Sequence, residues 1–328
     1  MKISMTLSTA KTKLFLIIAT VLLVSVAFLS LFVGKYPLSL EKILEGDVMH
    51  TRIFINLRLS RVIVGVFGGV ALGIAGFVFQ TVFRNPLASP DIIGVSSGAS
   101  TGAAVGILFF SGVFVTVFAF LGALLATAVA ILLSMFDRSG KNSTIVLAGI
   151  AVHSITQTVL MCLKLCADPE KELARIEYWI MGSLNAVSLD KILGNVLLGA
   201  VCVLLLVLLH RRIILLSGDE GEVRLLGVNV RLSRFIVLSV ATLTVSSVVS
   251  ITGLVSFTGL LAPHIARIIT RENRMSTMCL SGIIGGILLC IADILARSVS
   301  DVELPVSIFT GALGAPFLVY LILKRRSV

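Results

Sequence analysis

The chain has 328 residues, of which 57% are hydrophobic and 13% charged, and its mean hydropathy is +1.09. Soluble domains carry about 25% charged residues, so this composition excludes a water-soluble globular fold. The formal charge of +10 does not indicate nucleic-acid binding, because the Lys and Arg residues lie scattered between apolar runs and do not form one basic surface.

Ten apolar stretches follow one another, and we predict that each is a helix. Inside lipid only helices and closed barrels satisfy the backbone hydrogen-bonding groups, and these stretches lack the alternation of barrel strands. The first stretch is longer than the core of a signal peptide and no A-x-A cleavage site follows it, so we expect it to remain as the first helix. The predicted helices cover residues 14–34, 60–83, 92–110, 113–136, 143–165, 191–209, 232–252, 254–270, 275–296 and 305–323.

Charge indicates the orientation of these helices. With ten spans and both termini in the cytoplasm, most of the 27 Lys and Arg residues fall on the cytoplasmic side, as the positive-inside rule requires. Pro263 and His264 interrupt the stretch 254–270, but leaving this span out would place the basic C-terminus outside. The predicted fold is therefore an all-α membrane protein of about ten spans, forming one domain over residues 1–328.

The tetrapeptide Arg-Leu-Ser-Arg occurs at 58–61 and again at 231–234, each time directly before an apolar stretch. Five predicted spans separate the copies, which places them on opposite faces of the membrane. This pattern is typical of an inverted-topology repeat, in which the second to fifth helices are echoed by the seventh to tenth. Chance recurrence of four residues is the alternative.

Two predicted helices carry glycine stripes at helical spacing. Small residues let helix backbones approach closely in lipid, so we interpret both stripes as packing surfaces inside the protomer, with subunit contact or pore lining as the alternative. The stripes consist of Gly65, Gly69, Gly73 and Gly76, and of Gly94, Gly98, Gly102 and Gly106.

The sequence indicates neither a nucleotide-binding site nor a metal site in this chain. The nearest approach to a phosphate loop, Gly140-Lys141-Asn142, lacks the upstream glycine and the Ser or Thr after the lysine. We therefore expect that this chain binds no cofactor and that any ATP is bound by another chain. The five cysteines lack CxxC spacing and a partnering His cluster, so we interpret them as small apolar residues.

A family resemblance begins at FRNPLASPDIIGVSSGAS, residues 83–100, which contains Asn85, Pro86, Leu87, Pro90 and Gly94. This segment resembles the signature of the iron-siderophore, haem and cobalamin permease family, the membrane subunits of type II ATP-binding-cassette (ABC) importers. Further stretches agree in the expected order: LRLSRVIVGVFGGVALGIAGFVFQ (57–80), STIVLAGIAV (143–152), YWIMGSLN (178–185), LLGVNV (225–230), GLVSFTGLLAPHIAR (253–267) and ELPVSIFTGALGAPFLVYLI (303–322). The resemblance covers nearly the whole chain.

The resemblance implies a location in the lipid bilayer of the cell (inner, cytoplasmic) membrane and a set of partners. These are a second permease protomer, two cytoplasmic ATPase subunits that bind ATP and Mg, and a substrate-binding protein outside. Arg58, Arg61 and Arg297 match family arginines that hold glutamates of the binding protein. From the residues alone, the alternative is that these arginines extend to lipid headgroups. Ser60 stands where the family usually has proline, although serine can also begin a helix.

The polar segment 211–231 matches the cytoplasmic coupling element of the family, which contacts the ATPase subunits. Long polar loops in compact proteins are usually functional, although a solvated loop is the alternative. The residues that we expect to couple to the ATPase are Gly218, Asp219, Glu220, Glu222, Arg224, Leu225, Leu226, Gly227 and Val228.

Polar residues inside predicted helices are candidates for the transport path. Asn142 and Ser143 match small polar residues of the family's inner gate, but they can equally cap a helix. His153 and Gln157 lie one turn apart, where they line the path or form hydrogen bonds between helices. Asp293, four residues before Arg297, is predicted to form an ion pair with it that eases burial of the carboxylate.

These features together predict a permease without catalytic residues, which moves a ferric siderophore, or haem or cobalamin, delivered by a binding protein. An ion-coupled secondary transporter is the alternative, but it would need more ionisable groups within the membrane than Asp293 and His153. A membrane-embedded enzyme is disfavoured because the chain lacks an HExxH motif and paired aspartates within the predicted helices.

Overall fold

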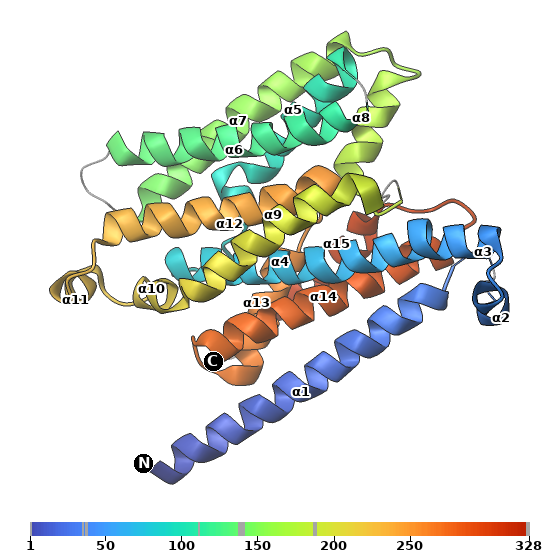
Figure 1. Ribbon diagram of the computed structural model, residues 1–328. Coiled ribbons are helices and arrows are strands. Elements are labelled where there is room, and N and C mark those ends of the chain that lie inside the picture. The colour runs from blue at the N-terminus through green and yellow to red at the C-terminus, as the bar shows by residue number, and fades with distance from the viewer. Residues whose placement is uncertain are drawn as a thin grey trace.

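The computed structural model describes residues 2–34, 36, 39–110, 112–136, 142–185 and 189–325, and within them the chain is all-helical. Each of the ten predicted helices is present as part of one bundle (Figure 1). Their bounds are α1 (Lys2–Phe32), α4 (Ser60–Val82), α5 (Val95–Phe109), α6 (Val113–Phe136), α7 (Asn142–Cys166), α9 (Leu189–Leu208), α12 (Val230–Thr252), α13 (Thr258–Thr270), α14 (Met275–Ser298) and α15 (Val306–Arg325).

Six of these helices, α1, α4, α6, α7, α12 and α14, are long and apolar enough to cross a membrane. The remaining four are shorter. At 1.5 Å per residue, the 13 residues of α13 extend over about 20 Å, which is less than the ~30 Å hydrocarbon core. The all-helical membrane fold is thus confirmed, whereas ten complete crossings remain a prediction.

The two ends of the bundle differ (Figure 1). Both ends of the described chain lie toward the left of the view, the same side as the short helices α10 (His210–Leu215) and α11 (Glu220–Leu225). The helices α2 (Leu40–Leu44), α3 (Val48–Ile53) and α8 (Glu172–Met181) lie at the opposite end. An even number of crossings produces this arrangement, in agreement with the predicted topology. Below, the end with α10 and α11 is called the inner end and the other the outer end.

Two segments that the sequence left as loops contain helix. α3 continues through η1 (Phe54–Leu59), a π-helical turn, directly into α4, so that the helix begins at Val48 and not at residue 60. Asp47 caps it: its carboxylate accepts hydrogen bonds from the backbone N–H groups of His50 and Met49, at 3.0 and 2.8 Å, which lower the pKa of the Asp47 carboxyl. The short helix α2 precedes it in the same segment, and α8 lies within the polar segment 166–190.

The two Arg-Leu-Ser-Arg copies lie at opposite ends of the bundle. At the outer end, buried Arg61 forms an ion pair with Glu303, and at the inner end buried Arg234 forms one with Glu220. The first copy lies where η1 joins α4 and the second lies in the first turns of α12, and each supplies a buried arginine to an ion pair. This is the placement that an inverted repeat would have, and the repeat itself stays a prediction.

α4 runs through the middle of the bundle and packs against α9, α12, α13 and α14 (Figure 1). Its glycines lie where neighbouring backbones pass. A Cβ atom on Gly69 would collide with the carbonyl oxygen of Gly285 in α14, and one on Gly76 would collide with that of Gly259 in α13. Gly98 and Gly102 of α5 face α6 in the same way. The interpretation of both stripes as packing surfaces is therefore confirmed.

Replacing Gly69 by alanine tests this packing. The new methyl group would force the backbones of α4 and α14 apart, and we expect a loss of about 2 kcal/mol of stability, measured as a lower temperature of thermal unfolding in detergent. Gly194 in α9 has no neighbouring atom within 4 Å of an added Cβ, so Gly194→Ala is the matched control and should not destabilise the protein. A Gly69→Ala protein as stable as the wild type would contradict the role given to this contact.

Candidate functional site

Three buried arginines gather at the outer end of the bundle. Arg58 lies in the last turn of η1, Arg61 in the first turn of α4, and Arg297 in the last turn of α14. Their exposed fractions are only 6%, 7% and 2%. The structure therefore brings the three predicted docking arginines together, although more than two hundred positions separate Arg61 from Arg297 in the chain.

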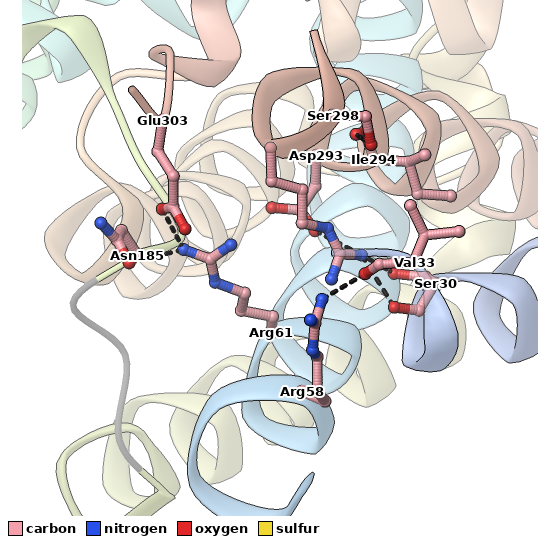
Figure 2. A network of polar contacts seen from close by, with 10 residues as sticks. Ser30, Val33, Arg58, Arg61, Asn185, Asp293, Ile294, Ser298 and Glu303 are labelled. Atoms are coloured by element: carbon pink, nitrogen blue, oxygen red, sulfur yellow. Dashed lines mark hydrogen bonds and ion pairs between the residues drawn. The ribbon is translucent and has the colours of Figure 1, made fainter. Parts of the chain in front are cut away.

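Two of the guanidinium groups bond to segments far away in the sequence (Figure 2). Arg58 donates to the carbonyl oxygen of Val33, as Figure 2 shows, and to that of Tyr36 at 3.2 Å. Arg61 donates to Oδ1 of Asn185 at 2.6 Å and forms a 2.5 Å ion pair with Glu303. The sequence alone did not point to Asn185 and Glu303 as partners, although both lie in stretches that carry the family resemblance.

Arg297 forms the predicted ion pair with Asp293, at 3.1 Å, and donates to the carbonyl oxygen of Ser30 at 2.9 Å. Its Nε and Nη1 atoms are buried and have no hydrogen-bond partner among the described residues. Buried donors without partners are costly, so this guanidinium retains capacity for a further acceptor.

The arginines border a cavity of about 190 Å³, called here the arginine cavity. Asp293 and Glu303 supply two carboxylates against three guanidinium groups, so the cluster is net positive. Such a cluster suits an incoming carboxylate, because the planar donor fork of arginine matches a carboxylate in geometry and charge. The lining residues are Gly34, Tyr36, Ile53, Leu57, Arg58, Arg61, Asn185, Arg297 and Glu303.

A second set of cavities follows the non-helical residues 253–257 between α12 and α13. The outer cavity, of about 480 Å³, is lined in part by α8, including its residues Arg175 and Trp179. The middle cavity, of about 380 Å³, and the inner one, of about 270 Å³, share Asp91 and Ser256. Backbone that leaves the helix at membrane depth must be buried in protein or line water. These three cavities are therefore the candidate path.

The predicted path residues are only partly described. His153 and Gln157 line the middle cavity. α7 begins at Asn142, but the side chains of Asn142 and Ser143 lie outside the described residues. Asp91, which was not among the predicted path residues, lines both the middle and the inner cavity, and its carboxylate accepts hydrogen bonds from the hydroxyl groups of Ser96 and Ser89.

The signature residues shape the loop that carries Asp91. The side chain of Asn85 accepts a 3.0 Å hydrogen bond from the backbone N–H of Leu87. Pro86 precedes that residue, and Pro90 begins the short 3₁₀ helix η2 (Pro90–Ile93). Gly94 adopts a φ of +81° at the start of α5, beside Val152 of α7. These residues therefore fold the loop against α7.

The segment 211–231 lies at the inner end and has one buried and one exposed side. Val223 is 3% exposed in the core, whereas Leu225 and Leu226 are 89% and 67% exposed. Glu220 forms a 2.6 Å ion pair with Arg234, which fastens α11 to α12. Leu225 and Leu226 form the tip of this segment, and the other predicted coupling residues surround it. Asp219 caps α11 by accepting a hydrogen bond from the N–H of Gly221, and Gly227 ends the turn with a φ of +76°. The remaining ones lie on or near α11 or are half-buried beside it: Gly218, Glu222, Arg224 and Val228.

Comparison with known protein families shows to which family the chain belongs. A family model described as the FecCD transport family matches residues 14–324. The chain belongs to the FecCD transport family.

Individual FecCD relatives cover nearly the whole chain. The molybdate import system permease protein MolB of Haemophilus influenzae is 33% identical, with 94% of each chain covered. The hemin transport system permease protein HmuU of Yersinia pestis is 32% identical over 93% of this chain and 94% of that one. A solved structure, described as an inward-facing conformation of a metal-chelate type ABC transporter, matches with a TM-score of 0.85 at 32% identity, covering 94% of this chain and 98% of that chain.

As a FecCD member, the protein is a multi-pass membrane protein and the permease subunit of an ABC importer. It is the transport component and not a catalytic one, and ABC importers carry their ATPase as a separate part. The predicted family, the absence of enzymatic function and the membrane location are confirmed. An importer of this type implies an ATPase and a binding protein as partners in general.

Proposed function

We propose that this FecCD permease pairs with a second protomer, binds two ATPase subunits through α10 and α11, and carries a ferric siderophore delivered by a binding protein at the outer end. The observation that carries the proposal is the pair of exposed leucines, Leu225 and Leu226, at the tip of the inner end. Neighbouring exposed leucines outside the lipid-facing helices indicate a surface for another protein.

The way in which these leucines are attached to the bundle supports a role in transmitting movement from the ATPase. Val223 anchors the same short helix in the core, and the ion pair between Glu220 and Arg234 holds it on α12. A partner that binds the leucine tip therefore pushes on a segment attached to the bundle at two points. Alternation between outward-open and inward-open arrangements then follows as rigid-body movement driven by ATP binding in the partner.

Substituting Leu225→Glu together with Leu226→Glu tests the ATPase contact. Two charges in an apolar interface should lower co-purification of the ATPase with the permease at least tenfold. Leu44 is a matched control, because it is 87% exposed but lies on α2 at the outer end, so Leu44→Glu should retain the ATPase. Full retention of the ATPase by the double variant would refute docking at this tip.

The binding protein is proposed to dock at the arginine cavity. In the structure Glu303 is the ion-pair partner of Arg61. The Glu303 side chain is 28% exposed, whereas the Arg61 side chain is 8% exposed. A glutamate from outside would thus compete with Glu303 for Arg61 and could also accept from the free Arg297 donors. Charged contacts at such a rim favour rapid and correctly oriented encounter.

Changing Glu303→Gln should strengthen docking, because it removes the competing charge but keeps the shape. We expect the affinity of the cargo-loaded binding protein for the reconstituted permease to rise about three- to tenfold, and Arg61→Gln to lower it by at least as much. Glu45→Gln, which changes an exposed carboxylate at the end of α2, also at the outer end, is the control and should have little effect. Equal affinities for all four proteins would remove the arginine cavity from the docking surface.

Asp91 bears on the choice of cargo. A carboxylate in the path repels an oxyanion such as molybdate: two unit charges about 8 Å apart, at an effective dielectric of ~20, repel by about 2 kcal/mol. A neutral or cationic metal chelate meets no such barrier. The hydroxyl and amide groups beside Asp91 in the middle cavity, from Ser97, Ser100 and Gln157, suit the polar surface of a siderophore.

Uptake of a chelate panel tests this choice. The wild type should take up a neutral ferric trihydroxamate in preference to molybdate and to a triply anionic ferric catecholate. Asp91→Asn should raise uptake of the catecholate about tenfold and leave the trihydroxamate within twofold. Glu170→Gln, in the outer cavity, controls for a general change in charge. Preferential uptake of molybdate by the wild type would overturn the proposed cargo.

A further inference from the structure

Arg84 occupies an unusual position directly after α4. Its φ of +51° lies in the left-handed region that residues with a side chain seldom adopt. The side chain donates from Nε to the carbonyl oxygen of Leu216, at 3.4 Å, and from Nη2 to that of Gly218. These two carbonyl groups belong to the turn between α10 and α11, more than 130 positions along the chain. An arginine at this point satisfies carbonyl groups that the end of α10 leaves without helical partners.

The loop that Arg84 begins leads to the candidate path. Ser89, Pro90 and Asp91 line the inner cavity, and Asp91 also lines the middle one. Only four residues separate Arg84 from Ser89, so one short connection joins the turn at the inner end to the lining of two cavities.

This connection is stiff. The backbone N–H of Asn85 donates to the carbonyl oxygen of Gln80 at 3.1 Å, and that of Ala88 donates to the carbonyl oxygen of Asn85 at 3.0 Å. Ala88 is completely buried, and two prolines restrict the backbone on either side of it. At the far end, Gly149 of α7 leaves no room for a side chain against the carbonyl oxygen of Ile92. A displacement at Arg84 therefore reaches Asp91 without being absorbed by a flexible loop.

We infer that Arg84 is the positioning residue that ties the ATPase-docking turn at 216–218 to the path loop 84–94, so that movement of α10 and α11 changes the lining of the inner cavity. The inference rests on the proposed docking of the ATPase at α10 and α11. It assigns to Arg84 the transmission of movement and no contact with cargo or with the ATPase.

Arg84→Gly is the sharpest variant. Glycine accepts the left-handed backbone conformation without strain, so the fold is kept while both hydrogen bonds to the turn are lost. Arg84→Lys should restore part of the function, since an ammonium group can still reach one of the carbonyl oxygens. Arg271→Gly is the matched control: Arg271 also has a left-handed φ, of +53°, and is exposed, but it is not one of the residues expected to couple to the ATPase.

The readout is the movement of the path loop, which does not depend on the identity of the cargo. A cysteine is placed at Ser89 in a chain whose exposed Cys162 and Cys166 are replaced by serine, and the complete importer is reconstituted in lipid. The rate of reaction of this cysteine with a water-soluble thiol reagent is compared between the nucleotide-free and the ATP-vanadate-trapped states.

In the wild type and in the control Arg271→Gly, we expect the two states to differ at least fivefold in labelling rate. With Arg84→Gly the difference should fall below twofold, while ATPase retention and ATP hydrolysis stay within twofold of the wild type. Uptake of ferric trihydroxamate per ATP should fall about tenfold in the same variant.

Three results would overturn the inference: no difference between states with Arg84 present, a full difference in Arg84→Gly, or a loss of ATPase retention together with thermal stability in that variant. Failure of the proposed docking is recognised separately, because it appears as ATPase retention by the Leu225→Glu, Leu226→Glu protein.

Discussion

The contact between the backbone of α4 and the backbones of α13 and α14 is the constraint on which the rest of the structure depends. In lipid, helices gain little from burying apolar side chains against one another, so close backbone approach at small residues supplies the packing. At Gly69 and Gly76 no side chain separates the helices, and α4 cannot shift without its neighbours. Because Arg61 lies at one end of α4 and Arg84 just beyond the other, this helix mechanically connects the outer and inner ends of the protein.

The two ends offer surfaces of different chemistry. The outer end presents a net positive cluster in which Arg61 is already paired with Glu303, so a partner that binds Arg61 must displace this internal carboxylate. The inner end presents an apolar tip on a firmly held short helix. A reversible charged contact suits a binding protein that arrives and leaves with each cargo molecule, whereas an apolar contact suits an ATPase that stays attached.

The sequence predicted the features that depend on local patterns. Apolar runs marked the ten helices, with charge supporting the interrupted stretch 254–270. The four-residue spacing marked the pair of Asp293 and Arg297, and glycine spacing marked the packing surfaces. The continuation of the second predicted helix back to Val48, through η1 and α3, was missed because polar residues interrupt the apolar pattern before residue 60.

Contacts between segments that lie far apart in the sequence also could not be predicted from the sequence pattern. The pairing of Arg61 with Glu303 joins positions 242 residues apart, and the bonds from Arg84 to the turn at 216–218 depend on how whole helices pack. Neither the partners of the docking arginines nor the place of Asp91 in two cavities can be read from spacing. Both follow from tertiary structure, in which the loop after α4 folds back against α7.

The central claim is that a separate ATPase drives transport through this chain. Its most direct test is uptake of radiolabelled ferric trihydroxamate into vesicles that contain the permease, with its binding protein outside, either with or without the ATPase subunits. The account predicts accumulation only when the ATPase and internal MgATP are both present. Accumulation without the ATPase, driven by a proton or sodium gradient, would contradict it.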